Sequence, residues 1–228
     1  MNRSRKFLGT MLLGMLACAP WAAHAQLIIS DTLTGASSSY DWQALNGACL
    51  TAGNDTGTIP ACIGKKLTYY TQNNSLLVGG TNGRLPDTVG FGALRLTNGD
   101  ITNGGSNGDN QTGAVVGTKT FPTNQGLQVT FTTVTYGGDG NNGTGADGIS
   151  FFLSDGKYAP SVGGLGGSLG YSCSNVNAQY DGVVGGYLGI GIDEYGNFSN
   201  PGDNTNSGPG FKPGRISVRG AGNINWAS

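Results

Sequence analysis

Short apolar runs separated by Gly- and Asn-rich stretches constrain the fold of this sequence more than any other feature. The 228 residues include 43 glycines, and only 11% of the residues are charged. Turn signals separate the strand-like runs, which occupy 93–97, 113–121, 127–136, 149–153, 187–193 and 216–219. After residue 25 no segment has a convincing helical period. The pattern therefore predicts a turn-rich all-β domain, and the low charge argues against disorder.

Two of these runs have the most distinctive patterns. Residues 127–136 (LQVTFTTVTY) alternate most regularly, with Leu127, Val129 and Phe131 on one face, and form the clearest predicted strand. Residues 149–153 (ISFFL) are short and mainly apolar, as expected for a strand that is buried on both faces.

The N-terminal segment has the pattern of a secretory signal peptide. Basic residues in 3–6 precede an apolar run at 7–17, and small residues at 23–25 form a cleavage site. The apolar run is too short to span a bilayer, and no other segment approaches 18 apolar residues. We expect residues 1–25 to be removed and residues 26–228 to form one secreted domain without a membrane span. The alternative is lipid attachment at Cys18, but the residues before it match a lipoprotein signal poorly.

Removal of residues 1–25 changes the net charge and the set of side chains available for catalysis. It takes away three of the 12 basic residues and none of the 13 acidic ones, so the formal net charge falls from −1 to −4. This balance argues against nucleic acid or an anionic membrane as a partner. The sole histidine, His24, is also lost, and Glu194 is the sole glutamate. Without a Ser-His-Asp set or the paired glutamates of sandwich-fold glycosidases, we expect no enzyme.

Three cysteines remain after export. Cys49 and Cys62 are close in the sequence, and in an oxidising compartment we expect them to form a disulfide. Cys173 is then either buried and free, or paired with a cysteine beyond residue 228.

Oxygen-bearing residues follow the end of one strand-like run at steps of two. Asp193, Tyr195 and Asn197 would supply carboxylate, carbonyl and amide oxygens, which are the ligands that calcium takes from a tight loop. Either Asn200 or Asp203 would complete the set. The alternative is an ordinary Asp/Asn turn, and composition alone favours neither interpretation.

Two further segments are candidates for ligand contact. Asp147, in GADGISFFL, would accept hydrogen bonds from two sugar hydroxyls, although on its own Ala-Asp-Gly is more often a simple turn. Residues 163–170 (GGLGGSLG) offer bare backbone amides to a ligand, or form only a flexible loop. The glycines do not follow a strand and open a helix, so a dinucleotide site is disfavoured.

The order of four motifs resembles a known family. GALRLTN, GADGISFFL, GGSLGY and GIDEYGNF occur in succession, within a match that covers most of residues 27–226. They are similar to the L-type (legume-lectin-like) domain of bacterial surface adhesins. CLTAG, GGSLGYSCSN and PGRISVRGAG are similar to the N-terminal region of PilY-type type IV pilus-tip proteins. The resemblance implies a concanavalin-like jelly-roll sandwich of antiparallel sheets, which we expect to be incomplete at the C-terminus because the family continues with further strands.

The resemblance also implies a sugar site. Asp147 would bind sugar hydroxyls and would follow a cis Ala146–Asp147 peptide bond. Gly167 would donate its amide to the same sugar, and Asn197 would face it.

A calcium site is implied beside the sugar. Its ligands would be Asp193, the Tyr195 carbonyl, Asn197 and Asp203, the acid closest to the position of the family's last carboxylate. We expect no transition-metal site, because Gly191 stands where plant members have a glutamate and the mature chain has no histidine.

The implied function is a secreted, calcium-dependent carbohydrate-binding module of a cell-surface or pilus-tip adhesin. Its ligand would be a glycan, and pilus subunits would be further partners. The alternative is a structural pilus-tip component with a degenerate sugar site, and a glycosidase relic is a third interpretation. Neither the sugar nor the oligomeric state follows from the sequence.

Overall fold

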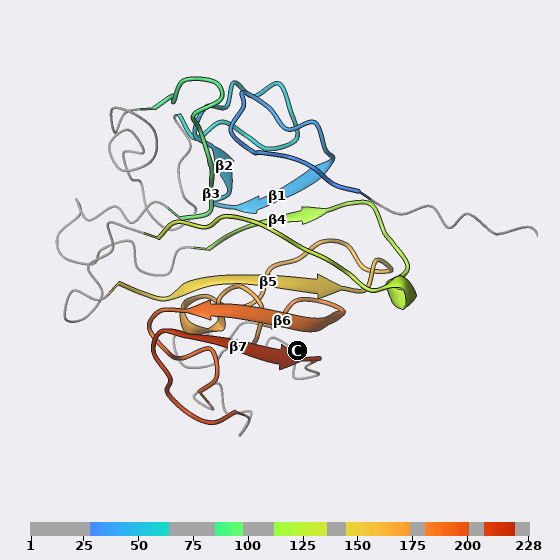
Figure 1. The fold of residues 1–228 in the computed structure, drawn as a ribbon, viewed down its shortest axis with the longest axis vertical. Coiled ribbons are helices and arrows are strands. Elements are labelled where there is room, and N and C mark those ends of the chain that lie inside the picture. The colour runs from blue at the N-terminus through green and yellow to red at the C-terminus, as the bar shows by residue number, and fades with distance from the viewer. Residues whose placement is uncertain are drawn as a thin grey trace, which may run out of the picture.

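A computed structural model describes residues 28–63, 85–97, 112–135, 145–173, 181–200 and 208–221 (Figure 1). The strands are β1 (Trp42–Asn46), β2 (Cys49–Leu50), β3 (Leu94–Arg95), β4 (Gly113–Gly117), β5 (Gly148–Ser154), β6 (Gly186–Asp193) and β7 (Arg215–Gly220). Two single-turn 3-10 segments, η1 (Thr123–Gln125) and η2 (Gly166–Ser168), complete the regular elements. The predicted signal segment, residues 1–25, and the predicted calcium ligand Asp203 lie outside the described residues.

The strands pair into antiparallel sheets. β1 pairs with β4, β2 pairs with β3, and β5, β6 and β7 form a sheet in that order. One isolated parallel bridge joins Leu50 to Ala61. In the part of the chain that the structure describes, η1 and η2 are the only helical turns. The predicted all-β class is thus confirmed.

The β1–β4 pair lies above the β5–β6–β7 sheet in Figure 1, and residues 127–135 run back from η1 past β5 and β4 as an extended chain. The Phe131 ring stacks on that of Phe151 in β5, with 6.5 Å between the ring centroids. Residues 127–135 are therefore held beside β5 by side-chain contact.

β6 alternates between two faces of its sheet. Gly189, Gly191 and Asp193 are buried on one face, and the Leu and Ile residues between them are half-buried on the other. A Cβ atom added to Gly189 would lie 2.3 Å from the Tyr171 ring, and one added to Gly191 would lie 2.4 Å from the Phe198 ring. The glycines thus allow both rings to pack against the strand. These rings form the main buried cluster with Val183, and burying each of them stabilises the fold by about 1.5–3 kcal/mol.

The N-terminal part of the described chain is built around a disulfide. Cys49 and Cys62 are bonded, as predicted, and both are fully buried. Leu50 and Ile59 are buried with them. Closure of a loop of this length stabilises a fold by about 3 kcal/mol in the chain-entropy model. Cys173 is buried and forms no disulfide with the other described cysteines.

The strand predictions at 93–97, 113–121, 187–193 and 216–219 each overlap a strand, but two other predictions need correction. Residues 127–135, the described part of the predicted strand 127–136, form no strand. Their alternate apolar side chains are about half exposed, so the alternation does not mark a buried sheet face. β5 is half-buried along most of its length, not buried on both faces. β1 and β2 were not predicted.

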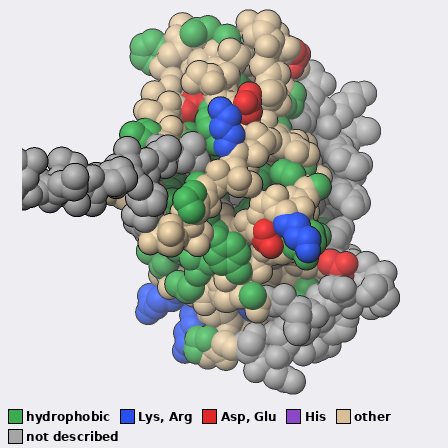
Figure 2. Space-filling view, turned by 90° about the vertical axis from the view of Figure 1, so that its right-hand side faces the viewer, with side chains coloured by type: hydrophobic (Ala, Val, Ile, Leu, Met, Phe, Trp, Pro, Cys, Tyr) green, Lys and Arg blue, Asp and Glu red, His purple; other side chains and the backbone are tan. Residues whose placement is uncertain are grey.

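Figure 2 shows the end of the molecule at which β5 and β7 terminate. Hydrophobic side chains gather near the middle of this face, and Lys and Arg side chains lie in several separate places. On the described part of the face they do not form the single basic patch that is typical of a nucleic-acid-binding surface.

Candidate functional site

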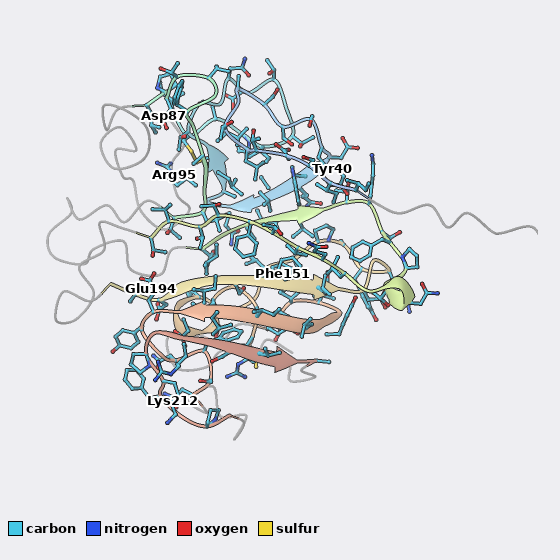
Figure 3. The ribbon with its side chains drawn as sticks, viewed as in Figure 1. Tyr40, Asp87, Arg95, Phe151, Glu194 and Lys212 are labelled. Carbon is cyan, nitrogen blue, oxygen red and sulfur yellow. A yellow bond between two sulfur atoms is a disulfide. The ribbon has the colours of Figure 1, made fainter. Side chains whose placement is uncertain are left out.

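The pairing of β5 with β6 brings the two predicted acidic residues to one end of the sheet. Gly148 is opposite Asp193, so the start of β5 and the end of β6 coincide. The carbonyl of Asp147 accepts hydrogen bonds from the backbone N–H groups of Glu194 (3.0 Å) and Tyr195 (3.2 Å). Figure 3 shows Glu194 at this end of the sheet. The backbone of Asp147 is therefore fastened to the start of the loop that follows β6.

Glycines on both sides of Asp147 fit the local backbone. The Ala146–Asp147 peptide bond is cis, as the family resemblance implies. Gly145 and Gly148 have positive φ angles of 74° and 144°, a region that disfavours residues with a side chain. A Cβ atom on Gly148 would also lie 2.2 Å from the Ile192 carbonyl oxygen. Gly148 is therefore required by the close approach of β5 to β6.

The loop after β6 folds around the carboxylate of Asp193. This side chain is only 1% exposed. Its Oδ1 accepts the backbone N–H of Gly196 and its Oδ2 accepts that of Phe198, both at 2.7 Å. Gly196 has a φ of 113°, which allows the tight turn. The Asp/Asn turn considered from the sequence is therefore present, and a carboxylate has about four acceptor sites, more than these two bonds occupy.

Negative charge is concentrated at this end of the sheet. Burial and, as the smaller cause, the nearby charge of Asp193 together raise the pKa of Asp147 to about 6. Burial also raises the pKa of Asp193, against the opposing effects of its backbone hydrogen bonds and of Arg219. A cation bound near both carboxylates would favour their charged forms.

The glycine-rich loop at 163–170 reaches the same place. Ser150 of β5 donates its hydroxyl to the Leu169 carbonyl at 2.7 Å, which fixes the loop to the sheet. Gly167, in η2, lies directly against Asn197, because a Cβ atom on Gly167 would be 2.2 Å from the Asn197 Cβ. Only glycine allows this contact.

The Asn197 side chain is itself held by a neighbour. Its Oδ1 accepts from the side-chain amide of Asn200 at 3.0 Å, and its carbonyl accepts the Asn200 N–H at 2.9 Å. Asn200, one of the two predicted final calcium ligands, is therefore adjacent to Asn197.

The described candidate ligands suit a hard cation. Asp193, Asn197 and the Tyr195 carbonyl provide oxygen atoms within one turn. No backbone N–H from the described residues donates to the Tyr195 carbonyl. No group of three or more His, Cys, Asp or Glu side chains gathers among the described residues. Among the described residues the predicted calcium set contains one such side chain, that of Asp193. The absence of a larger group therefore does not bear on the predicted calcium site.

The structure thus brings Asp147, Gly167 and Asn197 together around the Asp193 loop. Sequence reasoning missed two residues that complete the arrangement, Phe198 and Arg219. Phe198 is the last residue of the GIDEYGNF motif and is fully buried. Arg219 comes from β7, and nothing in its local sequence indicates which loop it contacts.

Comparison with known proteins finds no matching family model, curated protein or solved structure. Within the described residues no helix has the length and apolar character needed to cross a membrane.

Proposed function

We propose that this chain is a calcium-dependent carbohydrate-binding module of a secreted adhesin, with a concanavalin-like jelly-roll fold, displayed at a cell surface or pilus tip. The observation that carries the proposal is the meeting of three separate segments at one end of the β5–β6–β7 sheet. Asp147 precedes β5, Gly167 lies in η2, and Asn197 follows β6. The antiparallel sheets support the fold assignment.

Calcium would be held by Asp193, the Tyr195 carbonyl and Asn197, with Asn200 or Asp203 as a further ligand. The bound ion would supply positive charge beside two carboxylates whose pKa values are raised by burial. The chain's own contribution is to hold the loop in place, through the backbone donors that Asp193 accepts.

The sugar would be bound by groups that the fold leaves free. No hydrogen bond from the described residues occupies the carboxylate of Asp147, so it can accept two hydroxyl hydrogen bonds. The bare backbone at Gly167 would donate its amide, and Asn197 would face the same ligand. These are the roles that the family resemblance implies for the three residues.

One observation favours the alternative, a structural pilus-tip component with a degenerate site. Both Asp193 oxygens already accept backbone N–H groups, which would hold the loop without an ion. The two functions differ in their need for calcium and in their ligand.

A glycan array probed with the purified protein tests the proposal. We expect binding to a defined set of glycans in calcium and loss of that binding in a chelator. Absence of glycan binding in calcium, together with incorporation into pili in a chelator, would instead support the structural role.

A further inference from the structure

Arg219 extends from β7 to the loop that carries the candidate ligands. Its Nε donates to the Phe198 carbonyl, and its Nη2 donates to the Asn200 carbonyl at 3.3 Å. The guanidinium carbon also lies 5.4 Å from the centroid of the Phe198 ring, within the range of a cation–π contact. One side chain therefore contacts the loop by two hydrogen bonds and a ring contact.

The glycine-lined face of β6 makes this reach possible. Arg219 is opposite Gly189 in the sheet, and the Phe198 ring lies against Gly191. Phe198 then connects Arg219 to the site, because its carbonyl accepts from Arg219 while its N–H donates to Asp193 Oδ2. The contacts of Arg219 thus lead through one residue to the candidate calcium ligand.

A role limited to holding β7 in the sheet does not account for these contacts. Both described acceptors of Arg219 belong to the loop, and neither belongs to β6 or β7. β7 pairs with β6 over its full length, from Arg215 to Gly220. In addition, the Tyr171 hydroxyl donates to the Gly220 carbonyl at 2.9 Å, so the end of β7 is fastened independently.

We propose that Arg219 is a positioning residue for the calcium and sugar site, holding the turn at 197–200 so that Asp193 and Asn197 keep their orientation before any ligand binds. This inference rests on the proposed function for the identity of the ligand. The positioning itself is a property of the metal-free protein and can be measured separately.

Positioning and charge make opposite predictions for calcium. The positive charge of Arg219 lies close enough to Asp193 to lower its pKa, and so it should oppose a second cation. If charge were the only effect, Arg219→Met would bind calcium more tightly than the natural protein. If positioning dominates, Arg219→Met binds calcium more weakly in spite of the lost charge.

The experiment compares Arg219→Met and Arg219→Lys with Arg215→Met. The control removes the same charge from the same strand at an exposed position whose one side-chain bond goes to the adjacent Gly214. Hydrogen exchange is measured in a chelator, and calcium affinity is measured by titration calorimetry. In Arg219→Met we expect about tenfold faster exchange at the Gly196 and Phe198 amides and about tenfold weaker calcium binding, as for loss of hydrogen bonds from a charged group. Arg219→Lys should be intermediate, and Arg215→Met should match the natural protein.

The outcomes separate the two proposals. Unchanged exchange at Gly196 and Phe198 in Arg219→Met, or tighter calcium binding, would overturn the positioning role. Absence of calcium binding to the natural protein would overturn the proposed function, while the exchange measurement would still decide the role of Arg219. If Arg219→Met does not fold, Arg219→Lys decides, because it keeps the charge but not the planar donor pair. Unchanged loop exchange in that variant would then reject the proposal.

Discussion

Gly191 packs so closely against Phe198 that a side chain at position 191 would overlap the Phe198 ring. A Cβ atom on Gly191 would lie 2.4 Å from the Phe198 ring, which is fully buried. By the family resemblance, Gly191 would stand where plant members have a glutamate. In this chain a side chain at position 191 would displace the Phe198 ring, so the close packing requires glycine there.

The first prediction concerns this contact. Gly191→Ala should lower the free energy of unfolding by about 1–3 kcal/mol, as for overpacking of a close-packed core. Gly220→Ala is the matched control, since it lies in the adjacent strand and a Cβ atom there would have nothing within 4 Å. Urea unfolding of both variants checks the difference. Equal stabilities would show that the Phe198 ring can move away without cost.

The second prediction concerns pH in the absence of metal. Burial and the charge of Asp193 raise the pKa of Asp147 to about 6 in the folded protein, above its ordinary value of about 4. The folded state therefore binds more protons than the unfolded state between these values, so this group makes stability fall as pH rises from about 4 to about 6. Asp147→Asn should remove this contribution and stabilise the metal-free protein at neutral pH relative to the parent.

Urea unfolding in a chelator, at several pH values across that window, measures the effect. The test is the difference between the two proteins, because other acids titrate in both. A constant difference at all pH values would contradict the raised pKa of Asp147.

The third prediction concerns calcium. Binding should raise the melting temperature by mass action, with little response to manganese. Asp193→Ala should lose the calcium response. It should also destabilise the metal-free protein by roughly 1–3 kcal/mol, because the buried N–H groups of Gly196 and Phe198 lose their acceptors. Thermal melts across a calcium titration separate the two effects, and a variant that keeps the full calcium response would exclude Asp193 as a ligand.

The sequence allowed β5, β6 and β7 to be predicted because each is an apolar or alternating run bounded by turn residues. The alternating pattern at 127–135 gave a wrong prediction. Alternation shows that a segment could present one apolar face, but it does not show whether another layer of the protein covers that face. β1 is a short segment (WQALN) whose polar residues do not alternate, and β2 has only two residues, so neither gives a clear period.

The candidate site was predictable only in part. The acidic and amide residues could be placed at strand ends from their local sequence. Their meeting at one end of a sheet depends on the pairing of Gly148 with Asp193. The meeting of these residues was expected only through the family resemblance. Arg219 could not be predicted, because its contact with residues 198 and 200 results from β7 pairing beside β6.

The last prediction concerns sugar recognition. Asp147 and Asp193 lie at the same end of the sheet, and among the described residues only Asp193 accepts backbone N–H groups of the loop through its carboxylate. Asp147→Asn should therefore weaken glycan binding by about ten- to a hundredfold, as for a lost acceptor of roughly 1–3 kcal/mol. The same variant should keep most of the calcium-dependent rise in melting temperature, whereas Asp193→Ala should lose both properties. Binding to an immobilised glycan selected on the array, measured for both variants in calcium and in a chelator, provides the comparison. Glycan binding that survives both substitutions would show that the sugar is recognised elsewhere on the protein.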